Sequence, residues 1–95
     1  MDEIKIIREK LSPVELLCQL AEECAVLSQA ALKLRRALTK ANPTPVSPGE
    51  AYKNLCEEIS DVMLVLEVFA FDKDAPIIQK FREKKIKRWV SRLGG

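Results

Sequence analysis

The sequence predicts a small all-α protein, an antiparallel helical bundle that oligomerisation completes. Apolar residues make up 47% of the chain and aromatic residues only 5%, a balance that favours helix packing over sheets. The apolar residues recur at the three- and four-residue spacing of helices, and no useful run alternates as a β-strand does. The 95 residues suffice for one domain, which we place at residues 1–95.

Capping signals divide the chain into helices. Residues 2–10 can form a short helical turn. The first long helix is expected from Pro13 to about Thr39, because Ser12 offers a capping hydroxyl, Pro13 suits the first helical position and Glu15 follows three residues after the cap.

The second half of the chain repeats this arrangement. Two prolines make residues 41–46 a loop, and Ser47 and Pro48 then open a second helix that we expect to end near Ala70. Residues 72–76 form the next break. A third long helix is expected from about Pro76 to Leu93, and two glycines end the chain.

Composition excludes several classes of function. The net charge is only +2 and histidine is absent, so we expect no nucleic-acid partner and no histidine-based zinc site or acid–base catalyst. Cys18, Cys24 and Cys56 lie within apolar helical patterns and are expected to be buried and reduced. No signal peptide or membrane-spanning stretch is apparent, which predicts a cytoplasmic protein without a membrane partner.

Three carboxylates occupy the apolar faces of the two long helices. At 100° per residue, Glu23 falls within the stripe formed by Leu16, Leu20, Leu27, Ala30 and Leu34. Asp61 shares a face with Val65, Val68, Leu64, Asn54 and Glu57, and Glu58 lies one turn before it. The sequence therefore predicts that Glu23, Glu58 and Asp61 converge between the helices.

Inward carboxylates need a compensating cation, because an ionised group withdrawn from water without a partner is costly. One candidate is a hard divalent metal, Mg²⁺ or alternatively Mn²⁺. The other is a pair of cations on the third helix, Lys85 and Arg88, which lie near Phe81 and Ile77 on the helical wheel. These two cations can also grip a phosphate or form a solvated basic face.

The acidic motifs resemble those of a known family. The segments Leu20-Ala21-Glu22-Glu23 and Leu27 to Lys33, then Glu57-Glu58-Ile59-Ser60-Asp61-Val62, are similar to the two metal motifs of the MazG-like all-α nucleoside triphosphate pyrophosphohydrolases. Lys85-x-x-Arg88-Trp89 resembles the basic end of their third helix. The resemblance extends from about Ser12 to Leu93.

The resemblance implies an enzyme that hydrolyses a nucleoside triphosphate to a monophosphate and pyrophosphate with Mg²⁺. It also implies a dimer or tetramer, and the wide apolar surface of the second helix independently predicts a homo-oligomer. The implied metal ligands are Glu23, Glu58 and Asp61. Glu22 or Glu57 is implied as the catalytic base or as a ligand of a second metal. The implied substrate contacts are Lys33, Asn54, Lys85 and Arg88.

The sequence departs from the family pattern at one position. The first motif of the family reads Glu-Glu-x-x-Glu, and its third acid is Val26 here. Two further hypotheses stand beside the enzyme, the first of them because valine cannot bind a metal. One is a catalytically impaired relative that binds a nucleotide or a partner. The other is a purely structural bundle in which Lys85 and Arg88 neutralise the inward acids.

Overall fold

A computed structural model describes residues 2–40, 42, 44–69 and 75–95, and these residues form four helices and no strand. The helices are α1 (Glu3–Lys10), α2 (Pro13–Thr39), α3 (Pro48–Phe69) and α4 (Ala75–Arg92). The all-α class is thus confirmed, as are the starts of both long helices. The predicted end of the second helix at Ala70 and most of the break at 72–76 lie outside the described residues. No described helix is long and apolar enough to cross a membrane.

The caps form as the sequence predicts. The Ser12 hydroxyl accepts a hydrogen bond from the backbone N–H of Glu15 at 3.3 Å, and the Ser47 hydroxyl accepts one from Glu50 at 3.2 Å. At the other end of α2, Lys40 adopts a left-handed conformation with φ 56° and donates its N–H to Arg36. These contacts satisfy backbone groups that a helix end leaves without a partner.

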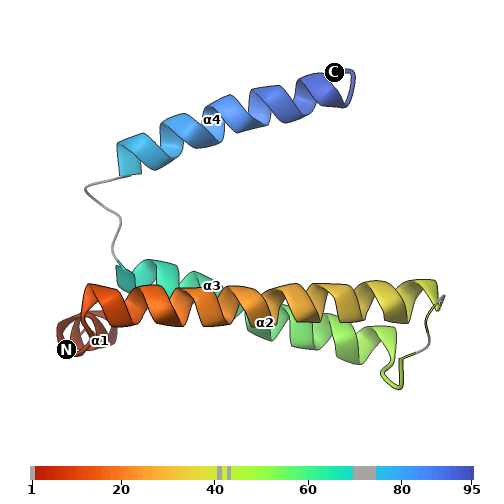
Figure 1. The fold of residues 1–95 in the computed structure, drawn as a ribbon, viewed down its shortest axis with the longest axis horizontal. Coiled ribbons are helices and arrows are strands. Elements are labelled where there is room, and N and C mark those ends of the chain that lie inside the picture. Colours follow the sequence, from red (N-terminus) through yellow and green to blue (C-terminus); the bar gives the residue numbers. More distant parts are fainter. Residues whose placement is uncertain (1, 41, 43, 70–74) are drawn as a thin grey trace.

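The centre of the fold is an antiparallel pair of long helices, α2 and α3 (Figure 1). Their buried apolar side chains are few and mostly small: Leu16, Ala30 and Ala37 from α2, with Ala51, Val65 and Val68 from α3. Small residues allow close approach of the two helices. They also make a thin core, so the pair buries little apolar area for its length.

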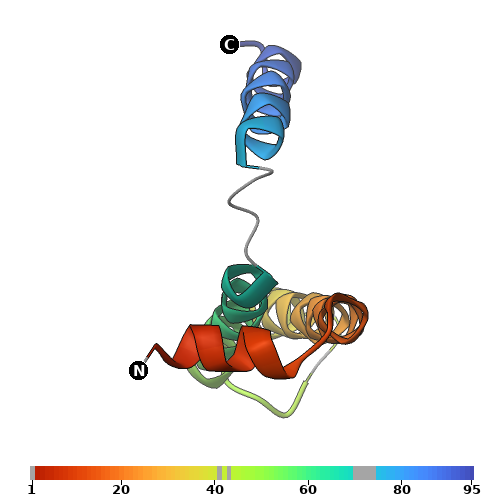
Figure 2. The same cartoon turned by 90° about the vertical axis from the view of Figure 1, so that its left-hand side faces the viewer.

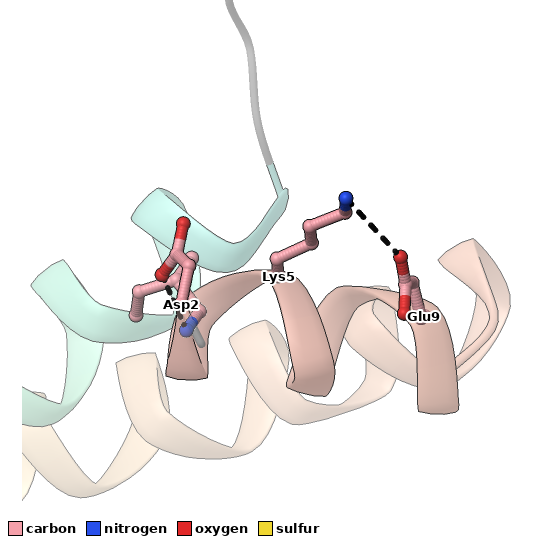
Figure 3. A network of polar contacts seen from close by, with 4 residues as sticks. Asp2, Lys5 and Glu9 are labelled. Atoms are coloured by element: carbon pink, nitrogen blue, oxygen red, sulfur yellow. Dashed lines mark hydrogen bonds and ion pairs between the residues drawn. The ribbon is translucent and has the colours of Figure 1, made fainter.

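Helix α1 lies across one end of this pair and contacts α3 (Figure 2). Arg8 fixes it there, donating from Nε to the carbonyl of Val68 at 2.9 Å and from a terminal nitrogen to that of Glu67 at 3.1 Å. Both carbonyls belong to the last turn of α3, where a cation is also favoured by the helix dipole. The ion pair of Lys5 and Glu9 joins residues within α1 itself (Figure 3).

Helix α4 stands apart from α2 and α3 in both views (Figures 1 and 2). Its last turn closes with Gly94 at φ 83° and Gly95 bonded to the carbonyl of Val90, the glycine-dependent ending typical of α-helices. All of its residues are exposed, including Ile77, Ile78, Phe81, Ile86, Trp89 and Val90. One chain by itself therefore does not complete a helical bundle.

The predicted burial of the cysteines is wrong. Cys18, Cys24 and Cys56 are free thiols exposed to solvent. The sequence pattern places them among apolar residues, but each lies off the face where α2 meets α3. Burying them would need a further layer of helices, which the single chain does not supply.

Candidate metal centre

Three carboxylates meet halfway along the α2–α3 pair. Each of Glu23, Glu58 and Asp61 offers one oxygen, and these oxygens all lie within 4.8 Å of one another. Glu23 comes from the middle of α2, and Glu58 and Asp61 project from successive turns of α3. We call these three residues the carboxylate triad. Helical periodicity in the sequence predicts the same three residues.

The triad is partly withdrawn from water. Glu58 is only 9% exposed to solvent, and Glu23 and Asp61 are half-buried. Gln19, one turn before Glu23 on α2, donates a hydrogen bond from Nε2 to Glu23 Oε1 at 2.8 Å. Gln19 was not among the predicted site residues, although its four-residue spacing from Glu23 is a usable signal.

The electrostatics of the triad are repulsive. The pKa of Glu58 is raised above its ordinary value, first by burial and then by the negative charges of Asp61, Glu57 and Glu23. A hydrogen bond to Asp61 also raises this pKa because it favours the protonated form. In the part of the chain that the structure describes, no lysine or arginine forms an ion pair with the triad.

The donor set fits a hard divalent cation. Mg²⁺ and Mn²⁺ prefer carboxylate oxygens and retain water at their remaining positions. A cation among the three oxygens would also remove the repulsion that raises the pKa of Glu58. Soft or histidine-dependent metals have no matching ligands here, because the chain contains no histidine and the three carboxylates form the cluster.

A cavity of about 500 Å³ lies one helical turn from the triad. Val26 and Asn54 connect the two features, since Val26 follows Glu23 on α2 and Asn54 precedes Glu58 on α3. The lining comprises Val26, Gln29, Ala30, Leu32, Lys33, Arg36 and Asn54. We call it the cationic cavity.

The cationic cavity contains two predicted substrate contacts, Lys33 and Asn54, and both are half-buried. It also contains Arg36, which is not among the predicted site residues. The spacing from Lys33 to Arg36 places them on neighbouring positions of one helix face, a signal that was available. Val26, where the family pattern has an acid, is 42% exposed and lines this cavity.

The two predicted catalytic acids lie outside the triad. Glu22 and Glu57 are both exposed. Glu57 is close enough for its charge to raise the pKa of Glu58, whereas no described contact ties Glu22 to the triad. Their proposed role as base stays a prediction.

The structure does not bring Lys85 and Arg88 to the triad within one chain. Both lie on α4, which is separate from α2 and α3 (Figure 1). Together with Trp89, Arg92 and Leu93 they line a hollow of about 390 Å³ on that helix.

Comparison with models of known protein families, with curated proteins and with solved structures gives no match. The MazG-like resemblance therefore stays a prediction from the residues of the sequence.

Proposed function

We propose that the protein is a Mg²⁺-dependent nucleoside triphosphate pyrophosphohydrolase of the MazG-like type. The observation that supports this best is the pairing of two oppositely charged features. Three carboxylate oxygens lie within 4.8 Å of one another, and a cavity begins at Val26, one turn from Glu23, and extends along α2 to Lys33 and Arg36. A substrate carrying several phosphates needs both a metal and cationic side chains.

In this proposal Glu23, Glu58 and Asp61 hold Mg²⁺, with Mn²⁺ as an alternative. The chemistry that the metal supplies when bound is neutralisation of phosphate charge and a more acidic water. Glu22 or Glu57 accepts the proton of the attacking water. Lys33 holds phosphate oxygens, and Asn54 donates to or accepts from the sugar or base. Water hydrolyses the anhydride bond between the α and β phosphates, giving a nucleoside monophosphate and pyrophosphate.

The test is pyrophosphate release from a panel of canonical and modified nucleoside triphosphates with Mg²⁺. We expect turnover of at least one nucleotide by the natural sequence and loss of that turnover in Asp61→Asn. Glu67→Gln, which neutralises an exposed acid two turns further along α3, is the matched control and should retain activity. An inactive natural sequence that also binds no Mg²⁺ by calorimetry would contradict the proposal.

A second candidate function is a catalytically impaired relative that binds nucleotides or a partner. Val26 favours it, because the described chain has three clustered carboxylates and a valine lines the adjacent cavity. Under this hypothesis nucleotide binding persists without turnover. Val26→Glu would then create or raise pyrophosphate release, whereas an unchanged inactive variant would show that position 26 was not the obstacle.

We further propose that the chain works as a homodimer or homotetramer in which α4 packs on another copy. Apolar side chains are exposed along α4, and α2 and α3 also expose large ones such as Leu32 and Met63. The charges are complementary: residues 75–93 carry seven basic and one acidic side chain, leaving nine basic and thirteen acidic elsewhere. Light scattering after gel filtration tests this, and a stable monomer at micromolar concentration would refute it.

The cytoplasm is the proposed location. Mg²⁺ and nucleotides are abundant there, and three exposed free thiols persist best in a reducing compartment. Alkylation of the thiols in freshly lysed cells is the corresponding measurement. Extensive disulfide formation by Cys18, Cys24 or Cys56 would contradict this location.

A further inference from the structure

The side of α3 that faces away from α2 carries exposed apolar side chains. Cys56 and Met63 lie about 160° and 140° around the helix from Glu58 of the triad. Ile59 and Met63 are 40% and 63% exposed. A hollow of about 600 Å³ on this side is lined by Cys56, Ile59, Ser60, Met63, Leu64 and Glu67. An exposed apolar surface of this kind is typical of a contact with another protein.

These side chains have the spacing of a coiled-coil contact. Exposed residues recur along α3 at alternating steps of four and three: Tyr52, Cys56, Ile59, Met63 and Leu66. Two helices that pack side by side along their length use this spacing. We call these five residues the α3 seam. All five are exposed, so the packing of α3 on α2 leaves the seam open to a further helix.

The two flanks of the α3 seam differ in character. One flank carries Lys53 and Glu67, which are exposed, and neither forms an ion pair in the part of the chain that the structure describes. The other flank carries Leu55 and Val62, which are apolar and half-buried. When a helix packs on a copy of itself that runs the opposite way, each flank meets the same flank of the copy. The apolar flanks then meet each other, and so do the charged ones.

The seam is self-complementary in this antiparallel arrangement. If a two-fold axis passes midway between Cys56 and Ile59, Cys56 packs on Ile59 of the other copy. In the same register Tyr52 packs on Met63 of the other copy, so both steps of the seam find apolar partners. A parallel pair would instead place the charged flank of one copy against the apolar flank of the other.

The same register pairs opposite charges. Lys53 and Glu67 of the other copy lie about 7 Å apart along the helix axis. Side chains on a helix lean toward its own N-terminus, so in an antiparallel pair these two side chains lean toward each other. The symmetry repeats the contact, which gives two Lys53–Glu67 pairs in each dimer. Pairs of this kind at the edge of a helix contact select the partner and its direction.

We infer that the α3 seam is the centre of the homodimer, where α3 of one copy packs antiparallel on α3 of a second. This inference rests on the self-association proposed above and identifies the surface that forms it. From Tyr52 to Leu66 the seam extends about 21 Å. One helix pair of that length covers less area than the roughly 1,600 Å² of a typical stable interface. The seam and the α4 contact are therefore two parts of one interface, and both are needed for a stable dimer.

Alkylation of the natural cysteines locates the partner. The free thiol of Cys56 lies in the α3 seam, whereas those of Cys18 and Cys24 lie on α2. We expect N-ethylmaleimide to react with Cys56 at least about tenfold more slowly well above the dimer Kd than well below it, because mass action then leaves few free monomers. Peptide mass spectrometry measures the rate at each thiol. A Cys56 that stays fully reactive while the protein self-associates would overturn the inference.

Charge exchange tests the antiparallel direction. Lys53→Glu and Glu67→Lys each replace two attractive contacts with two repulsive ones, so either variant should dimerise about tenfold more weakly. Glu67→Gln adds no repulsion and should weaken the dimer less. An equimolar mixture of Lys53→Glu and Glu67→Lys restores both pairs in the mixed dimer and should recover the natural affinity. A mixture as weak as its components would overturn the antiparallel pairing.

A matched pair of apolar positions separates the seam from a general effect of surface charge. Met63 on α3 and Leu38 on α2 are both 63% exposed. Met63→Glu should abolish the dimer because it withdraws a carboxylate from water in the seam, whereas Leu38→Glu should retain it. Light scattering measures the mass, and circular dichroism checks that the helices remain folded. Equal loss of the dimer in both variants would overturn the inference.

The seam and self-association fail in distinguishable ways. A natural sequence that stays monomeric at micromolar concentration would contradict both. A dimer that survives Met63→Glu and leaves Cys56 reactive would support self-association and contradict the seam. None of these measurements requires enzymatic activity, so the pyrophosphohydrolase proposal is tested separately.

Discussion

Glu58→Gln should change the stability of the protein in opposite directions with and without Mg²⁺. The carboxylate of Glu58 is the least exposed of the triad, and its pKa is raised by burial and by three neighbouring acids. Replacing it with a neutral amide of the same shape removes this repulsion. In metal-free buffer the variant should therefore melt at a higher temperature than the natural sequence.

With Mg²⁺ the order should reverse, and mass action gives the size. A metal present at about 100 times its Kd stabilises the folded state by about 2.7 kcal/mol. For a domain of this length that raises Tm by about 10–20 °C. The structure offers three carboxylates, so the variant loses one ligand of three. If that weakens binding about 100-fold, only about 0.4 kcal/mol of stabilisation remains, or about 2–3 °C.

Thermal melts of both proteins, with chelator and with Mg²⁺, measure these shifts. Glu57→Gln is the control, because it removes the same charge from the adjacent exposed residue of α3 but takes no oxygen from the triad. It should keep most of the response to Mg²⁺. If Glu57→Gln and Glu58→Gln respond alike, or if the natural sequence shows no shift with Mg²⁺, the reasoning about the triad is wrong.

Two further predictions concern pH and the attachment of α1. Because the pKa of Glu58 is raised in the folded state, the folded chain binds this proton more tightly than the unfolded chain does. The contribution of Glu58 to the stability of the metal-free protein should therefore grow as pH falls from neutral toward the ordinary carboxyl pKa. Over the same pH range Mg²⁺ should lose its stabilising effect. Melts at several pH values check this, and a Glu58-dependent change of opposite sign would refute it. Arg8→Met should destabilise the protein by about 1–2 kcal/mol, because it removes two hydrogen bonds to the end of α3. Urea unfolding measures that loss, and Lys5→Met, which removes only a surface ion pair, should cost about 0.5 kcal/mol or less.

Local features of the fold could be predicted because local chemistry determines them. Ser12 and Ser47 each begin a helix by binding a backbone N–H three residues later. The convergence of Glu23, Glu58 and Asp61 follows from the helical period once α2 and α3 pack antiparallel. For such features, the spacing of residues along the chain is nearly the whole explanation.

Contacts between distant segments could not be predicted where no helical pattern indicates them. The hydrogen bond from Arg8 to the carbonyl of Val68 joins residues 60 positions apart, and no local sequence pattern indicates it. For the cysteines, the sequence pattern predicted burial that the structure does not show. An apolar helical pattern indicates that some surface will cover a residue, but the covering surface need not belong to the same chain.

The position of α4 could not be predicted either, because its sequence does not specify which surface it contacts. Its sequence specifies an amphipathic helix, and in the part of the chain that the structure describes its large apolar side chains are exposed. Lys85 and Arg88 could therefore be placed on a helix from sequence, but not beside the triad. Arg36 was missed although its three-residue spacing from Lys33 is visible in the sequence, because that spacing alone does not show that a cavity forms where α2 and α3 come together.

Because the α2–α3 pair has a thin core, metal binding and assembly should both affect the stability of the folded chain. Among the residues that the structure describes, six apolar side chains are buried, and Leu16 is the only large one. Small domains have little stability to spare. The same pair of helices brings three acids together, and α4 leaves Phe81 and Trp89 exposed. The metal and the partner copy should therefore each stabilise the folded chain by mass action.

Tm should rise with protein concentration and with Mg²⁺ concentration independently. Phe81→Ser and Trp89→Ser should abolish the dependence on protein concentration but retain the response to Mg²⁺. A Tm that is independent of protein concentration over a hundredfold range would show that α4 does not mediate assembly.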